Sequence, residues 1–207
     1  MLTTLKSIIR RIDMYDAKII YDKYEPFSNK NSLLFFSALE GSERTEFEHL
    51  SDEEKKTYIS NSSAIHIPKV SIDEFYRDYK TVDSLTVEFT LDIIFSLVPE
   101  IKCTHDRYAD AFALFCILHE LGHWNHFLNC GKNVYRYIDD ATEAKKIFDE
   151  RKILQSKLLQ APLITDKLHK EARLWIHKYH DVPGEKIADD FARDHFLDNW
   201  IALQKDL

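Results

Sequence analysis

Three residues in the middle of the chain have types and a spacing that allow metal chemistry. His119 and His123 lie four positions apart, with Glu120 beside the first of them. Side chains four residues apart on a helix lie on the same face, so both imidazoles can reach one Zn²⁺. Glu120 can then accept a proton from a water molecule that the metal activates. The stretch 119–123 is therefore the first candidate for a catalytic centre.

The surrounding sequence predicts the helix that this chemistry requires. Between Asp106 and Asn129 there is no proline and only one glycine, Gly122. Large apolar residues recur at intervals of three and four, which is the period of a helix. Thr104 or Asp106 can cap its start, and Gly131 suits the left-handed residue that follows a helix. The stretch matches the H-E-x-x-H pattern of zinc peptidases, and the alternative is a pair of structural histidines on an amphipathic helix.

A catalytic zinc takes three protein ligands and leaves one position open, so one more ligand must be found. Spacing alone leaves two candidates. Glu143 follows His123 by twenty positions, and Glu185 follows it by sixty-two. Glu185 and Asp189 are four apart and share a helix face. In that case Glu185 would bind zinc, while Asp189 would accept the second N–H of a ligand histidine and fix its orientation.

Two blocks of sequence, His-Glu-Leu-Gly-His at 119–123 and Glu-x-x-Ala-x-x-Phe-Ala at 185–192, carry a family resemblance. Together they resemble the ImmA/IrrE family of zinc metallopeptidases and, more broadly, the gluzincins. The resemblance implies a zincin-like domain that hydrolyses a protein or peptide substrate. It also implies His119, His123 and Glu185 as zinc ligands and Glu120 as general base. Asp189 would orient a ligand histidine.

Peptide hydrolysis by this route also needs a donor to stabilise the oxyanion. Several residues after the motif have suitable side chains, and spacing does not choose among them. The candidates are His126, Tyr135, Tyr137, His177, Tyr179, His180 and His195.

Composition narrows the class of protein. The 207 residues suit a single domain, with 1–60 as a helical lead-in and 61–207 as the catalytic core. The formal charge of −7 argues against nucleic-acid binding as the main function. Three cysteines without C-x-x-C spacing favour a reducing compartment. We found no signal peptide and no membrane-spanning run, so the sequence predicts a cytoplasmic location.

The remaining chain divides into further predicted elements. We expect an amphipathic helix over 2–24, a buried strand over 33–39, and a solvated helix or loop over 40–63. Residues 64–70 alternate, and Pro68 indicates an edge strand, on which a peptide substrate could pair. Helices are predicted from Ser71 to Lys80, over 82–98, over 140–160 and over 166–179. A last helix would begin at 181–183 and end near Leu203.

These elements predict an α+β fold that is mainly helical, with a small sheet beside the motif helix. Two other functions stay open. One is a module of the same fold that acts by protein contact without catalysis, and the other is a zinc hydrolase with a different substrate.

Cys116, three positions before His119, lies on the motif helix and is more typical of a small buried residue than of a ligand.

Overall fold

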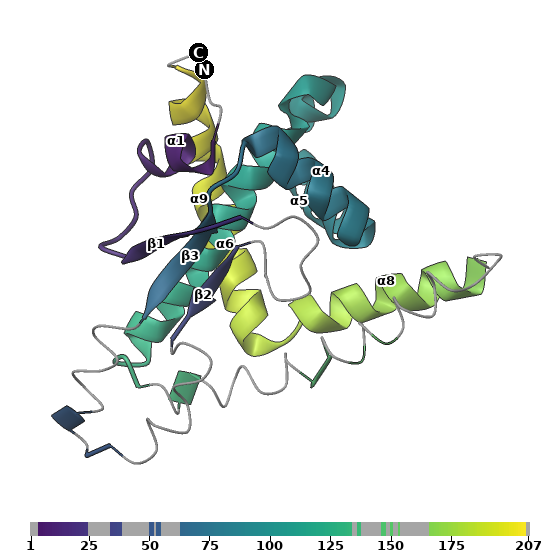
Figure 1. Cartoon of the computed structure of the whole chain (residues 1–207). Coiled ribbons are helices and arrows are strands. Elements are labelled where there is room, and N and C mark those ends of the chain that lie inside the picture. The colour runs from purple at the N-terminus through teal and green to yellow at the C-terminus, as the bar shows by residue number, and fades with distance from the viewer. Residues whose placement is uncertain are drawn as a thin grey trace.

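The structure is a computed structural model, and it describes residues 4–24, 34–38, 50–51, 53–54, 63–133, 136–137, 146–147, 150, 153 and 166–205. It is α+β and mostly helical, with a small three-stranded sheet (Figure 1). Its helices are α1 (Leu5–Ile9), α4 (Ile72–Val82), α5 (Ser84–Leu97), α6 (Tyr108–Asn129), α8 (Asp166–His180) and α9 (Pro183–Gln204). Two 3₁₀ helices, Pro99–Cys103 and His105–Arg107, precede α6.

The sheet contains β1 (Ile19–Asp22), β2 (Phe35–Ser37) and β3 (Ala64–Pro68) in the order β1-β3-β2. β1 is parallel to β3, with Ile19 opposite Ile65, and β2 is antiparallel to β3, with Phe36 opposite Ile65. The prediction that 64–70 is an edge strand is therefore wrong, because β3 is the central strand. Pro68 pairs with Asp22 of β1 and lies beyond His66, where the pairing between β3 and the described part of β2 ends.

The prediction of one long helix over 2–24 is also wrong. Of the described residues 4–24, only Leu5–Ile9 is α-helical, and the chain then turns through Tyr15 and Asp16, which have φ angles of 48° and 56°. The following isoleucines form β1 because β-branched side chains suit a strand that pairs with β3. Trp124 of α6 donates its indole N–H to the carbonyl of Tyr15 at 3.1 Å, which ties this turn to the motif helix.

The other helices agree more closely with the predictions made from the sequence. Ser71 caps α4 by accepting from the N–H of Glu74, and α5 covers most of the predicted span 82–98. α9 begins at Pro183, but its N-cap is Val182 and no side chain caps it, so the capping role expected at 181 is not seen. Of the strand predicted over 33–39, the described residues 34–38 contain β2 at Phe35–Ser37. The helix predicted over 140–160 and most of 40–63 lie outside the described residues.

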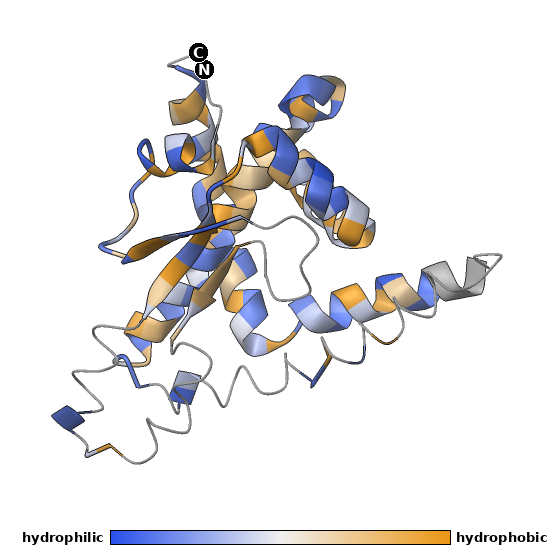
Figure 2. Ribbon diagram, viewed as in Figure 1, coloured by the Kyte–Doolittle hydropathy of each residue, from blue (hydrophilic) through white to orange (hydrophobic). Residues whose placement is uncertain are grey.

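α6 is the axis of the core. It contacts the sheet on one side and α4, α5 and α9 on others, so apolar residues surround it almost completely. Figure 2 shows hydrophobic residues continuing along α6 and the adjoining strands, whereas α8 alternates in character. As predicted, Gly131 follows the end of the helix in the left-handed conformation, with a φ of +67°. Gly131 and Lys132 donate to the carbonyls of Leu128 and Phe127, a Schellman motif.

α6 and α9 approach each other closely at Gly122 and Ala188. A Cβ atom added to Gly122 would lie 2.6 Å from the Cα of Ala188, so only glycine fits at this point. α9 packs against α6 more extensively than any other element does. The small residue inside the H-E-x-x-H pattern therefore lets Glu185 and Asp189 come close to the two histidines.

Within the described part of the chain, no helix combines the length and apolar character needed to cross a membrane.

Candidate metal centre

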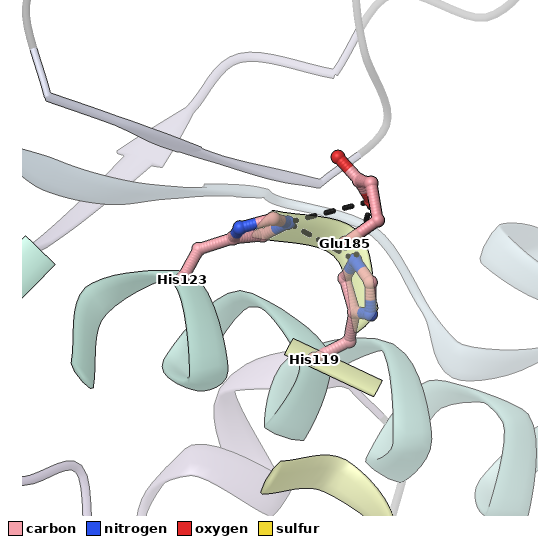
Figure 3. A group of neighbouring side chains, drawn as sticks. All are labelled: His119, His123 and Glu185. Carbon is pink, nitrogen blue, oxygen red and sulfur yellow. Dashed lines mark hydrogen bonds and ion pairs between the residues drawn. The ribbon is translucent and has the colours of Figure 1, made fainter. Parts of the chain in front are cut away.

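Three side chains from two helices converge on one point. His119 and His123 come from consecutive turns of α6, and Glu185 comes from the first turn of α9 (Figure 3). The Nε2 atoms of the two histidines are 3.1 Å apart. The Oε2 atom of Glu185 lies 3.3 Å from Nε2 of His119 and 3.6 Å from Nε2 of His123. Among the described residues, these three form the group able to hold a metal ion.

The spacing of these atoms fits a tetrahedral zinc. Bonds of about 2.0–2.2 Å at tetrahedral angles place two ligand atoms about 3.3–3.6 Å apart. The three observed separations of 3.1, 3.3 and 3.6 Å lie around that value. Two imidazole nitrogens and one carboxylate oxygen are a common ligand set of catalytic zinc.

The protonation pattern of the site also fits a cation. Oε2 of Glu185 is buried and, among the described residues, has no hydrogen-bond partner. Nδ1 of His119 lies 2.9 Å from Oδ1 of Asp189, and an ionised carboxylate can only accept, so Nδ1 is the donor. Neutral His119 then turns the lone pair of Nε2 toward Glu185. Lone pairs that converge in a buried site require a proton or a metal between them.

The pKa directions show how strongly a positive charge is favoured here. Burial opposes charge on His119, but its interactions with the carboxylates of Asp189 and Glu185 outweigh that effect, and its pKa is raised well above the usual value. Burial also opposes charge on Glu185, but the neighbouring His123 and His119 hold its pKa well below the usual value. Both pKa directions favour a positive charge between the two histidines and Glu185.

Asp189 contacts Nδ1 of His119, the ring nitrogen that does not approach Glu185, and it interacts with two histidines. Its Oδ1 accepts from His119, and its Oδ2 lies 2.7 Å from Nδ1 of His180, the last residue of α8. Burial alone would raise the pKa of Asp189. The hydrogen bonds from His119 and His180 have the larger effect and lower the pKa below its usual value, so the carboxylate stays ionised. Asp190, the next residue, is exposed.

Glu120 lies on the sheet side of the site. Its Oε2 accepts the backbone N–H of Phe36 in β2 at 2.6 Å. Burial raises the pKa of Glu120, although His123 and His119 partly offset that effect. A carboxylate with a raised pKa, next to a candidate metal centre, is a better proton acceptor than an ordinary glutamate.

The candidate oxyanion donors are placed in several different surroundings. The Tyr137 hydroxyl lies 3.4 Å from Nδ1 of His123, on the side of the ring away from Glu185. His180 contacts Asp189, and His195 lies 3.4 Å from the hydroxyl of Tyr15. His126 is buried against Tyr137, His177 lies against Phe89, and Tyr179 packs beside His180. Tyr135 lies outside the described residues, as does the alternative ligand Glu143.

Cys116 does not belong to the converging group. Burial raises the pKa of its thiol, and the charges of Glu120 and Asp189 raise it further, so the thiol stays protonated. Sequence reasoning missed three contacts of the site: Phe36 with Glu120, His180 with Asp189, and Gly122 with Ala188. The small residue at 122 was the only one of these with a signal in the sequence.

Comparison of the chain with protein-family models, with curated proteins and with solved structures gave no match.

Proposed function

We propose that this protein is a zinc-dependent metallopeptidase of the ImmA/IrrE-like, zincin type, which acts on a protein or peptide. One observation carries the proposal. His119, His123 and Glu185 bring three ligand atoms to the spacing of a tetrahedral zinc, and the buried Oε2 of Glu185 has no other partner in the described structure. The two blocks of sequence that resemble this family contain these same residues.

The residues around the centre would divide the chemistry between them. When bound, zinc supplies a Lewis acid that lowers the pKa of water and polarises a carbonyl group. Glu120 would accept the proton of the attacking water and pass it to the leaving amine. Asp189 would keep the proton of His119 on Nδ1, so that Nε2 stays available as a ligand.

The sheet offers a place for an extended substrate beside Glu120. β2 lies at one end of the strand order β1-β3-β2, and the Phe36 N–H points away from β3 toward Glu120. A peptide that pairs with this outer edge of β2 would pass next to the general base. In this proposal β2 takes the role that the sequence assigned to residues 64–70.

The proposal is tested by metal content and hydrolysis in the same preparations. We expect wild-type protein to hold one equivalent of zinc and to cleave members of a broad peptide library. Glu120→Gln should keep the zinc and lose hydrolysis by a factor of about 10²–10⁴, because an amide neither accepts nor returns the proton. Asn125→Gln, a change on the same helix that adds no charge, serves as the control.

Two outcomes would contradict the proposal in different ways. Protein that holds zinc but cleaves nothing in the library would favour a module that acts by protein contact. Glu120→Gln protein that turns over peptide at the wild-type rate would reject Glu120 as the general base.

A further inference from the structure

The carboxylate of Asp189 is shared by two histidines from different helices. Oδ1 meets Nδ1 of His119 at 2.9 Å, and Oδ2 meets Nδ1 of His180 at 2.7 Å. We infer that His180 is a positioning residue of the metal centre: it holds Asp189 in the orientation that fixes the ligand His119. This inference rests on the proposed zinc site.

Asp189 needs a second contact to hold one orientation. A carboxylate rotates about the bond to its methylene group, so a single hydrogen bond to Oδ1 does not fix the orientation of Oδ2. The side chain of Asp189 is only 6% exposed, which leaves little room for water to satisfy Oδ2. An ionised oxygen buried without a partner is costly. The shorter of the two contacts, that from His180, meets this need.

His180 is itself well fixed. Its ring stacks on Phe89 of α5, with centroids 4.3 Å apart and planes inclined by 25°. It is the last residue of α8, where a turn leads directly into α9. The contact therefore links α5 and α8 through Asp189 of α9 to the ligand-bearing helix α6.

The geometry assigns the protons along this chain of contacts. Each contact joins an Nδ1 atom to a carboxylate oxygen, which is the acceptor, so Nδ1 of His180 and Nδ1 of His119 are the donors. The proton on Nδ1 of His119 keeps the lone pair of Nε2 directed at the metal position. His180 thus acts behind the centre, and the oxyanion role considered for it from the sequence does not match this placement.

The first test is the zinc affinity of single variants, measured by competition with a chromophoric chelator. His180→Ala should weaken zinc binding by about tenfold, at the lower end of the range for groups that contact ligands indirectly. His180→Asn should restore affinity to within about threefold of wild type, because its amide places a donor near the position of Nδ1. His177→Ala is the matched control, since His177 also lies against Phe89 but makes no hydrogen bond to Asp189 in the described structure.

The second test separates positioning from general stability. If His180 acts through Asp189, then His180→Ala should weaken zinc binding no further in an Asp189→Ala background. The midpoint of thermal unfolding of each metal-free variant shows whether that variant is folded. If His180→Ala does not fold, His180→Asn still allows the test to be made.

The outcomes distinguish this inference from the proposed function. Wild-type protein that binds no zinc overturns the proposed function, and this inference with it. Wild-type protein that binds zinc, combined with unchanged affinity in His180→Ala, overturns this inference alone. Additive losses in the double variant, or no restoration by asparagine, overturn it as well.

Discussion

Two aspartate–histidine pairs in this protein have the same contact but different surroundings. In the sheet, Nδ1 of His66 lies 2.9 Å from Asp22, and between the helices Nδ1 of His119 lies 2.9 Å from Asp189. Asp22 is 43% exposed, whereas Asp189 is 6% exposed. The ring of His66 stacks on Phe35, and within the described residues His66 joins no metal-sized cluster.

The comparison shows what a metal site requires beyond such a pair. A carboxylate orients an imidazole in both places, but only His119 faces two further ligand atoms. That convergence depends on the helix period, which adds His123, and on the crossing of α6 and α9, which adds Glu185. The following predictions test this difference, from the largest expected effect to the smallest.

Removal of a proposed ligand residue should abolish metal binding between the helices. The matching substitution in the Asp22–His66 pair of the sheet should have no effect on metal binding. His119→Ala or Glu185→Gln should lose stoichiometric zinc, with affinity falling by more than the roughly 100-fold that marks the upper range for indirect contacts. His66→Ala should keep zinc. Metal analysis after dialysis against a defined free-zinc buffer measures both. Zinc retained in Glu185→Gln would exclude Glu185 as the third ligand.

The two aspartates should differ in the same way. Asp189→Ala should weaken zinc binding by about 10–100-fold, because the ligand His119 loses the group that fixes its proton and orientation. Asp22→Ala should leave zinc affinity unchanged, and so should Asp190→Ala, which removes an exposed carboxylate one position along α9. Equal losses in Asp189→Ala and Asp190→Ala would remove Asp189 from the site.

The helix crossing can be widened without touching a ligand. Gly122→Ala should cost about 1–3 kcal/mol of unfolding free energy, as overpacking does, because its methyl group meets the backbone of Ala188. Zinc affinity should fall too, since Glu185 moves away from the histidines. Gly131→Ala is the control: among the described residues, no atom beyond its chain neighbours lies within 4 Å of the added carbon, so strain at φ +67° should lower stability but not zinc affinity. Chemical denaturation and zinc titration measure the two effects.

Zinc affinity should also depend on pH with a definite sign. The pKa of His119 is raised, so metal-free protein carries a proton there at neutral pH, and zinc must displace it. Affinity should therefore rise with pH by about tenfold per unit for one displaced proton, and the rise should level off above the raised pKa. Titrations from pH 6 to pH 9, roughly centred on neutrality, test this. A flat profile would show that no proton occupies the centre.

Local patterns allowed the sequence to predict much of this site. The spacing of His119 and His123 and that of Glu185 and Asp189 both follow from a helix period, and the structure places each pair on a helix. The placement of His180 against Asp189 depends on where α8 ends relative to α9, which no local pattern encodes. The same holds for the Phe36 N–H at Glu120, since a backbone group has no signature in sequence.

The errors in the prediction of the fold have a related cause. Residues 2–24 have the apolar period of a helix, but Ile19 and Ile20 gain more by pairing with β3 than by continuing α1. Pro68 argued for an edge strand, because the sequence does not reveal that β1 and β2 pair with β3 on both sides. In both cases a contact with a distant segment overrode a local preference.

The position of the two ligand-bearing helices in the chain also has a consequence for polymer statistics. His123 and Glu185 are sixty-two positions apart, yet their helices touch at Gly122 and Ala188. A metal that joins them would act as a cross-link that closes a long loop. The entropy of closing such a loop grows only with the logarithm of its length, by about 0.6 kcal/mol for each doubling. The intervening length can therefore change greatly by insertion or deletion at little thermodynamic cost to the centre.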